Sequence, residues 1–88
     1  MKSADVTIRN RLGLHARPAS KIVHLAASGK SEVFLVKDKQ RVNARSILGV
    51  MLLAASFGST LRIEVAGEDE DVILAKLQEL VAGKFGED

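Results

Sequence analysis

The most constraining feature of this sequence is the strict alternation of apolar and polar residues in TLRIEVA, residues 60–66. Its three aliphatic side chains fall on one side of an extended chain, while Arg62 and Glu64 fall on the other. Such a strand covers an apolar core with one face and meets water with the other. It therefore predicts a sheet that is covered from one side, as antiparallel sheets commonly are.

The rest of the chain divides into short segments with extended or helical patterns, each with an apolar side. We expect strands over 4–9, 31–37 and 40–43, and helices over 16–27, over 46–55 and from the acidic residues 68–71 to Gly83. The predicted order is βαββαβα. The economical arrangement is one α+β domain over residues 1–88, in which a four-stranded antiparallel sheet carries three helices on one face.

The stretch NRLGLHARPAS, residues 10–20, combines groups that suit a phosphate. His15 falls at the N-cap of the first predicted helix, where Ser, Thr, Asp or Asn would cap better. A helix N-terminus attracts an anion, and Arg17 adds a fork of donors that fits phosphate oxygens. Pro18 stiffens the first turn, and Gly13 permits a tight loop beside the ring. The pattern predicts a nucleophilic imidazole beside a phosphate cradle; the alternative is a surface histidine followed by an exposed arginine.

The second histidine, His24, lies about 180° around the same predicted helix from His15. The two cannot share a site, and we expect His24 to be a solvated residue on the helix face. The chain has no cysteine, so neither a disulfide framework nor a thiolate zinc site can form. We expect no metal and no other cofactor.

A second motif, VNARSILGVMLLAAS, covers residues 42–56. Ser46 is a good N-cap for the second predicted helix, and its hydroxyl is also a candidate phosphorylation site, since a helix N-terminus tolerates the added charge. The helix is apolar on both sides, with Val50, Leu53 and Ala54 on one side and Ile47, Leu48, Met51, Leu52 and Ala55 on the other. It is either buried on both sides or shows an apolar patch to a partner, and in so small a domain we favour the patch.

The composition argues against several other classes of function. The net charge of +2 is too small to point to nucleic acid, and the three phenylalanines, without Tyr or Trp, do not form the aromatic run of an RNA-recognition sheet. The opening MKSADV turns polar at once, which argues against a signal peptide or a membrane helix. We therefore expect a protein that binds no nucleic acid and inserts into no membrane. The absence of cysteine fits a cytoplasmic protein, and we expect a monomer.

The segments GLHARPAS and NARSILGVM, which begin 30 positions apart, together resemble the HPr family, the histidine-containing phosphocarrier proteins of the bacterial phosphotransferase system. The resemblance spans essentially the whole chain, including the AGEDE turn before the last predicted helix. It implies an open-faced β-sandwich and a phosphoryl carrier rather than an enzyme.

The resemblance also implies roles for particular residues and partners. Enzyme I, phosphorylated by phosphoenolpyruvate, would phosphorylate His15 on Nδ1 with assistance from Arg17, and the phosphoryl group would then pass to an enzyme IIA protein or domain. Ser46 matches the site of an ATP-dependent HPr kinase/phosphorylase in species that have one. The residues that match the family's docking surface are Ile47, Leu48 and Met51, and we include the adjacent Leu52 in the predicted docking patch.

Three features depart from the family pattern. Leu52 stands where many members carry a small polar residue, Ala54-Ala55-Ser56 replaces a glycine-containing segment, and the tail AGKFGED resembles the nitrogen-related branch. They leave open a sugar-transport carrier, a nitrogen-branch carrier, or one carrier that serves both. A regulatory adaptor that works through Ser46 alone is a further alternative, and it would not need His15.

Overall fold

The computed structural model describes residues 1–87, and its elements follow the predicted order with one short addition at the end. The strands are β1 (Lys2–Thr7), β2 (Glu32–Lys37), β3 (Gln40–Asn43) and β4 (Thr60–Ala66); the helices are α1 (Ala16–Ser28), α2 (Ile47–Leu52) and α3 (Glu70–Ala82); the 3₁₀ helix η1 covers Lys84–Gly86. Strands β3 and β4 have the predicted bounds. Strand β1 begins and ends two residues earlier than predicted.

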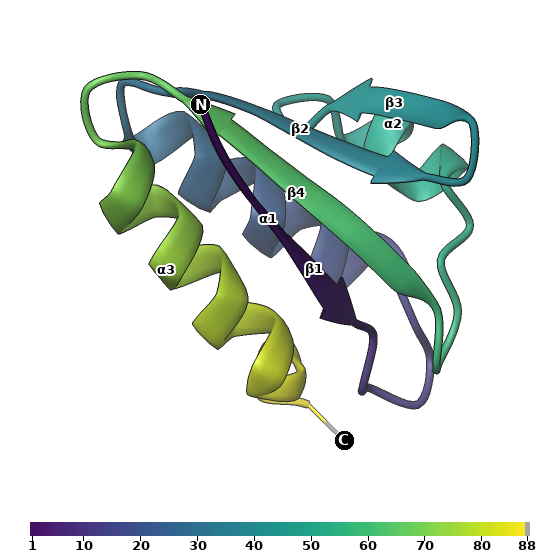
Figure 1. Cartoon of the computed structure of the whole chain (residues 1–88). Helices are drawn as coiled ribbons and strands as arrows, with labels where there is room; N and C mark the ends of the chain where they lie inside the picture. The colour runs from purple at the N-terminus through teal and green to yellow at the C-terminus, as the bar shows by residue number, and fades with distance from the viewer. Residues whose placement is uncertain (88) are drawn as a thin grey trace.

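The four strands form one antiparallel sheet in the order β1-β4-β2-β3. The strictly alternating β4 lies inside the sheet, hydrogen-bonded to β1 on one side and to β2 on the other. Helices α1 and α3 cover one face, α2 lies beside β3, and the opposite face is open (Figure 1). This is the predicted open-faced sandwich.

The apolar core lies between the sheet and the helices. Leu61, Ile63 and Val65 of β4 are buried, each with at most 1% of its surface exposed. The helices supply the facing layer, with buried Pro18, Ala19, Ile22 and Ala26 from α1 and Ile73, Leu74, Leu77 and Val81 from α3. The open face carries charged groups instead: the Arg41 guanidinium lies 3.8 Å from the centre of the Phe34 ring and pairs with Glu64 at 2.8 Å.

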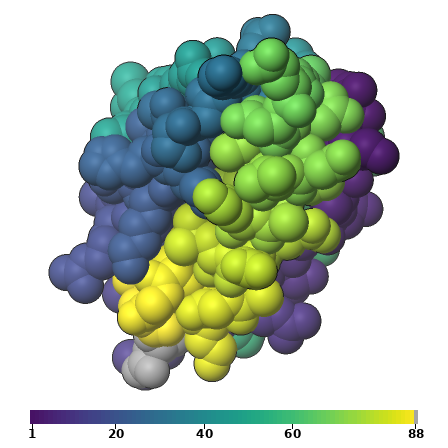
Figure 2. Space-filling model, turned by 90° about the vertical axis from the view of Figure 1, so that its left-hand side faces the viewer, coloured from purple at the N-terminus to yellow at the C-terminus, as the bar shows by residue number. Residues whose placement is uncertain are grey.

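Helices α1 and α3 lie against each other over the covered face of the sheet (Figure 2). Gly29 follows the last residue of α1, and its φ of −107° is extended rather than left-handed. A Cβ atom at this position would lie 2.6 Å from Cδ1 of Ile73 and 2.7 Å from Oδ2 of Asp69. The close approach of the start of α3, rather than a left-handed turn, therefore requires glycine here.

Helix α2 is shorter than predicted, and this corrects the sides assigned to two alanines. The helix ends at Leu52, and Ala54 takes a left-handed conformation with φ of 52°. The chain then leaves the helix, so Ala54 is exposed and Ala55 is buried, the reverse of the prediction. The carbonyl of Ala55 accepts a hydrogen bond from the amide of Leu14 at 2.9 Å, which ties this segment to the loop before α1.

The 3₁₀ helix η1 was not predicted, and it turns the chain back after α3. Phe85 lies within it at φ of 56° and is fully buried. Nζ of Lys21 on α1 donates a hydrogen bond to the Phe85 carbonyl. This anchor brings the following residues to the loop in front of α1.

Candidate functional site

His15 occupies the N-cap of α1, as the sequence predicts. Its backbone is extended, with φ of −83° and ψ of −170°, and its carbonyl accepts the amide of Ala19 at 3.1 Å. The imidazole makes no capping hydrogen bond to the helix and is half-buried. The side chain is therefore available for chemistry rather than used for capping.

The loop before His15 is held closely against the segment after α2. Gly13 has a φ of 70°, and a Cβ atom there would lie 2.6 Å from the Ala55 carbonyl oxygen. The Gly13 amide donates to the Asn10 carbonyl at 3.1 Å, and the His15 amide donates to the Gly13 carbonyl at 3.0 Å. Glycine is thus required both by the left-handed turn and by the close approach.

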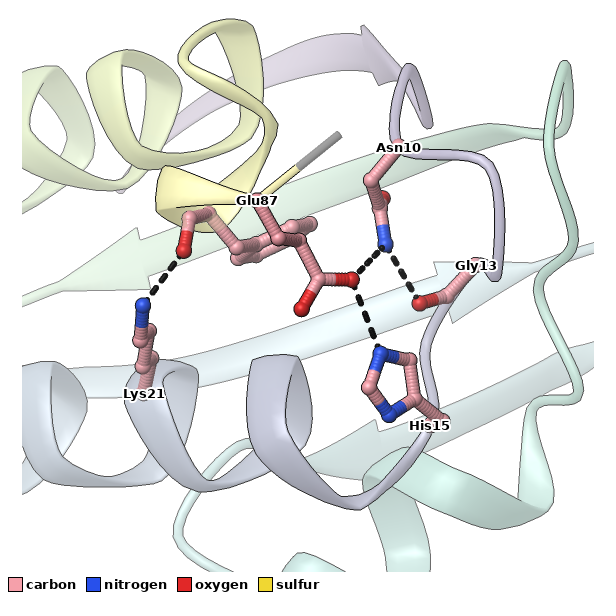
Figure 3. A network of polar contacts seen from close by, with 6 residues as sticks. Asn10, Gly13, His15, Lys21 and Glu87 are labelled. Atoms are coloured by element: carbon pink, nitrogen blue, oxygen red, sulfur yellow. Dashed lines mark hydrogen bonds and ion pairs between the residues drawn. The ribbon is translucent and has the colours of Figure 1, made fainter.

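A polar network connects this loop to the end of the chain (Figure 3). Nε2 of His15 lies 2.8 Å from Oε1 of Glu87. Nδ2 of the buried Asn10 donates to the same oxygen at 3.0 Å and to the Gly13 carbonyl at 2.7 Å. Figure 3 shows the other ring nitrogen, Nδ1, pointing away from Glu87, and no hydrogen bond among residues 1–87 involves it.

The Glu87 carboxylate accepts hydrogen bonds from two side chains, those of His15 and Asn10. Its side chain is 17% exposed. The hydrogen bonds from His15 and then Asn10 lower the pKa of Glu87 below its ordinary value, and the positive charge of Arg17 adds to this effect. Glu87 is therefore a carboxylate at neutral pH.

The N-terminus of α1 offers two amides to an anion. Within the part of the chain that the structure describes, the amides of Ala16 and Arg17 make no hydrogen bond, and Pro18 has no N–H. A cavity of about 260 Å³ is lined by Arg11, Leu12, His15, Arg17 and Glu87. The predicted pair, His15 and Arg17, therefore lies in one cavity, beside a helix N-terminus that favours negative charge.

Ser46 is exposed at the N-cap of α2, where its Oγ accepts the Gly49 amide at 3.0 Å. The apolar patch predicted on this helix is exposed: Ile47 by 43%, Leu48 by 68%, Met51 by 38% and Leu52 by 65%. Val50 and Leu53, on the other side, are buried. Helices α1 and α2 contact each other, so the loop that carries His15 and the apolar patch belong to neighbouring elements.

His24 is exposed on α1, as predicted. Among residues 1–87, no three His, Asp or Glu side chains gather in a way that could hold a metal ion. None of the helices described is both long enough and apolar enough to span a bilayer.

Four residues of the site were not predicted from the sequence: Asn10, Arg11, Leu12 and Glu87. The proline, the glycine and the N-cap position gave a local signal for His15. No local signal exists for Glu87, because its contact with His15 spans 72 positions.

Comparison with known proteins identifies close relatives. A family model described as the PTS HPr component phosphorylation site matches residues 2–83. The chain is 45% identical to the phosphocarrier protein HPr of Cupriavidus necator over 87 residues, which cover 99% of this chain and 98% of the relative. It is 39% identical to the phosphocarrier protein NPr of Shewanella violacea over 83 residues, 94% of this chain and 91% of the relative. Its structure resembles that of an HPr from Thermoanaerobacter tengcongensis with a TM-score of 0.95 and 40% identity, covering 100% of this chain and 99% of the other.

Proposed function

This chain belongs to the HPr family of phosphocarrier proteins of the phosphotransferase system, and we propose that His15 is the residue that carries the phosphoryl group. One observation carries the proposal: His15 occupies the N-cap position of α1 with Nδ1 turned away from Glu87, in a cavity that Arg17 also lines. A phosphoryl group on Nδ1 would stay near the surface, where a second protein can reach it.

The proposed donor is phosphorylated enzyme I, whose phosphoryl group comes from phosphoenolpyruvate. The lone pair of Nδ1 forms the new N–P bond while the bond from phosphorus to the donor breaks, and its electron pair stays with the donor. In the transition state, charge spreads over the three equatorial oxygens. The amides of Ala16 and Arg17 and the Arg17 guanidinium are suited to stabilise that charge. Transfer to an enzyme IIA protein or domain repeats this chemistry with the carrier as donor.

We assign the docking of these partners to the exposed patch of Ile47, Leu48, Met51 and Leu52. Exposed apolar side chains gain free energy when a partner buries them. The buried side of the same helix, Val50 and Leu53, fixes the patch relative to the core. Docking on α2 would bring a partner to the helix that contacts α1, where His15 lies.

We propose that Ser46 is a regulatory phosphorylation site for an HPr kinase/phosphorylase where the host has one. Its hydroxyl is exposed, and it lies next to Ile47 of the patch. A phosphate there adds nearly two negative charges beside the docking surface. It would weaken association with an acidic surface of enzyme I. Ser46→Asp should therefore raise the Kd for enzyme I at low salt, whereas Ser46→Ala should leave it unchanged; equal affinity of the two variants would contradict this role.

We further propose that the carrier acts as a monomer in the cytoplasm, without a cofactor and without nucleic acid. The enzyme IIA partner decides whether it serves sugar transport, the nitrogen branch or both. Transfer assays with an enzyme IIA protein of each branch distinguish these three alternatives. Light scattering of the purified protein tests the oligomeric state.

The central test uses enzyme I, phosphoenolpyruvate and the wild-type chain. We expect a phosphoryl adduct that is labile in acid and maps to His15 by mass spectrometry. An acid-stable adduct on Ser46 alone, formed with ATP and a kinase, would instead support the regulatory adaptor. The two outcomes separate a carrier from an adaptor, because only the carrier needs the imidazole.

A further inference from the structure

We propose that Glu87 is a positioning residue for phosphoryl transfer: its carboxylate accepts the Nε2–H of His15 and thereby leaves the lone pair of Nδ1 free to attack phosphorus. The proposal rests on the proposed role of His15 as the acceptor, and it adds a residue from the opposite end of the chain. Its basis is the 2.8 Å contact between Nε2 and Oε1 of Glu87.

The assignment of the proton follows from the chemistry of the two groups. An ionised carboxylate can only accept hydrogen bonds, and the donors around Glu87 lower its pKa below the ordinary value of 4.5. At 2.8 Å from such an oxygen, Nε2 must therefore be the donor. In a neutral imidazole with its proton on Nε2, Nδ1 is the nitrogen that has a free lone pair.

The buried Asn10 holds the carboxylate in place. Its Nδ2 can only donate, and it donates both to Oε1 of Glu87 at 3.0 Å and to the Gly13 carbonyl at 2.7 Å. Asn10 is fully buried. The carboxylate is thus tied to the loop that carries His15, and the acceptor oxygen faces the ring.

A second anchor lies two positions before Glu87 in the sequence. Phe85, two positions earlier, is fully buried, and its carbonyl accepts a hydrogen bond from Nζ of Lys21 (Figure 3). The contact with His15 is therefore supported by a buried aromatic ring and a buried amide, and it is not a chance approach of an exposed side chain.

The same contact assists the transfer step itself. When Nδ1 forms its bond to phosphorus, the ring loses electron density and becomes positively charged. The proton stays on Nε2, and the Glu87 carboxylate stabilises the developing charge from the opposite side of the ring. A carboxylate that holds an imidazole in one tautomer and stabilises its charged form has this effect in serine proteases.

The test compares Glu87→Ala and Glu87→Gln with Glu68→Gln as the control. Glutamine keeps an oxygen that can accept from both Asn10 and Nε2, but it removes the charge. Glu68 is an exposed carboxylate paired with Lys30 at 3.6 Å, so its replacement removes the same charge without touching the network. The tautomer is read from nitrogen NMR of the His15 ring in alkaline buffer, and transfer is read as kcat and KM with phosphorylated enzyme I.

We expect the wild type to carry its proton on Nε2, and Glu87→Ala to gain the Nδ1–H tautomer and lose about tenfold in kcat, with KM unchanged. Glu87→Gln should retain the wild-type tautomer and recover part of the rate, and Glu68→Gln should match the wild type in both measurements. A Glu87→Ala variant with the wild-type tautomer, an unchanged or faster rate, or a change confined to KM would overturn the positioning role. These outcomes are separate from failure of the proposed function, in which the wild type itself accepts no phosphoryl group at His15.

Discussion

Oε1 of Glu87 lies 2.8 Å from Nε2 of His15, although the two residues are 72 positions apart in the chain. The contact depends on η1, which buries Phe85 and returns the chain to the start of α1. Residues 84–87 are thus part of the histidine site rather than a tail outside the fold. It links the core packing of α3 and η1 to the loop on which phosphoryl transfer would take place.

The first prediction concerns the acceptor. His15→Ala should abolish the acid-labile adduct formed with enzyme I and phosphoenolpyruvate, because it removes the ring in the cavity with Arg17. His24→Ala is the matched control, since His24 is exposed on α1 and should accept no phosphoryl group. Intact-protein mass spectrometry before and after acid treatment measures both. An acid-labile adduct that persists in His15→Ala would remove the carrier assignment from this residue.

The second prediction concerns Arg17. Arg17→Lys should slow transfer by roughly tenfold, because an ammonium group cannot form the paired hydrogen bonds that a guanidinium makes to phosphoryl oxygens. Arg62→Lys is the control: Arg62 is exposed on β4, and its Nε lies 3.6 Å from Oδ1 of Asp5 on the neighbouring strand. Rapid-quench kinetics with phosphorylated enzyme I gives both rates. Equal rates for Arg17→Lys and the wild type would show that charge alone suffices.

The third prediction separates the patch from the core on α2. Leu48 is 68% exposed, so Leu48→Ala should change the free energy of unfolding by less than about 1 kcal/mol and weaken binding to enzyme I. Leu53 is 1% exposed, so Leu53→Ala should cost about 2–5 kcal/mol through lost burial and a cavity. Urea denaturation and enzyme I titration test the pair. Unchanged affinity for Leu48→Ala would place the docking surface elsewhere.

The fourth prediction concerns the strained residue after α2. Ala54 has a φ of 52°, a conformation that costs an L-residue about 1 kcal/mol or more relative to glycine. Ala54→Gly should therefore stabilise the fold by roughly 1 kcal/mol in urea denaturation, even though it removes a methyl group. Ala27→Gly, at an exposed position inside α1, should destabilise the fold by a similar amount. A loss of stability in both variants would rule out strain at residue 54.

The fifth prediction concerns the pH dependence of stability and Asp69, which connects the residues after α1 to the start of α3. The Ser31 hydroxyl, and then the Lys30 amide at 2.9 Å, donate to Asp69 and lower its pKa below the ordinary value of 3.8. A carboxylate with a lowered pKa stabilises the folded state above its ordinary pKa, and this contribution is lost as the pH falls through the lower, folded value. We therefore expect the free energy of unfolding, measured by urea denaturation at neutral and at acid pH, to fall less on acidification in Asp69→Asn than in the wild type.

Asp5→Asn provides the control for this measurement, because Asp5 makes one ion pair at 3.6 Å on the exposed side of the sheet. In Asp5→Asn, the free energy of unfolding should fall between neutral and acid pH by as much as it does in the wild type. An equal acid-induced loss in Asp69→Asn and the wild type would show that Asp69 does not contribute to the pH dependence.

The sequence alone was enough to predict the element order and the one-sided sheet. These predictions follow from local patterns, namely the alternation in β4, the helical periodicity in α1 and α3, and the glycines at turns. Each pattern can be recognised within a few residues. The position of His15 at an N-cap is also local, and so is the capping role of Ser46. The prediction that α2 exposes one apolar side was confirmed, because burial of both sides would require more core than this chain has.

Tertiary structure alone decided the early end of α2, the burial of Phe85 and the place of Glu87. Helix α2 ends at Leu52, and three residues later Ala55 bonds to the loop before α1; periodicity within the helix carries no information about that loop. Phe85 and Glu87 follow a predicted helix end, where the local pattern is too short to assign a structure. The contact of Glu87 with His15 exists only because the packing of α3 and η1 against the fold brings Glu87 to the loop before α1. Such long-range proximity depends on the whole core rather than on neighbouring residues.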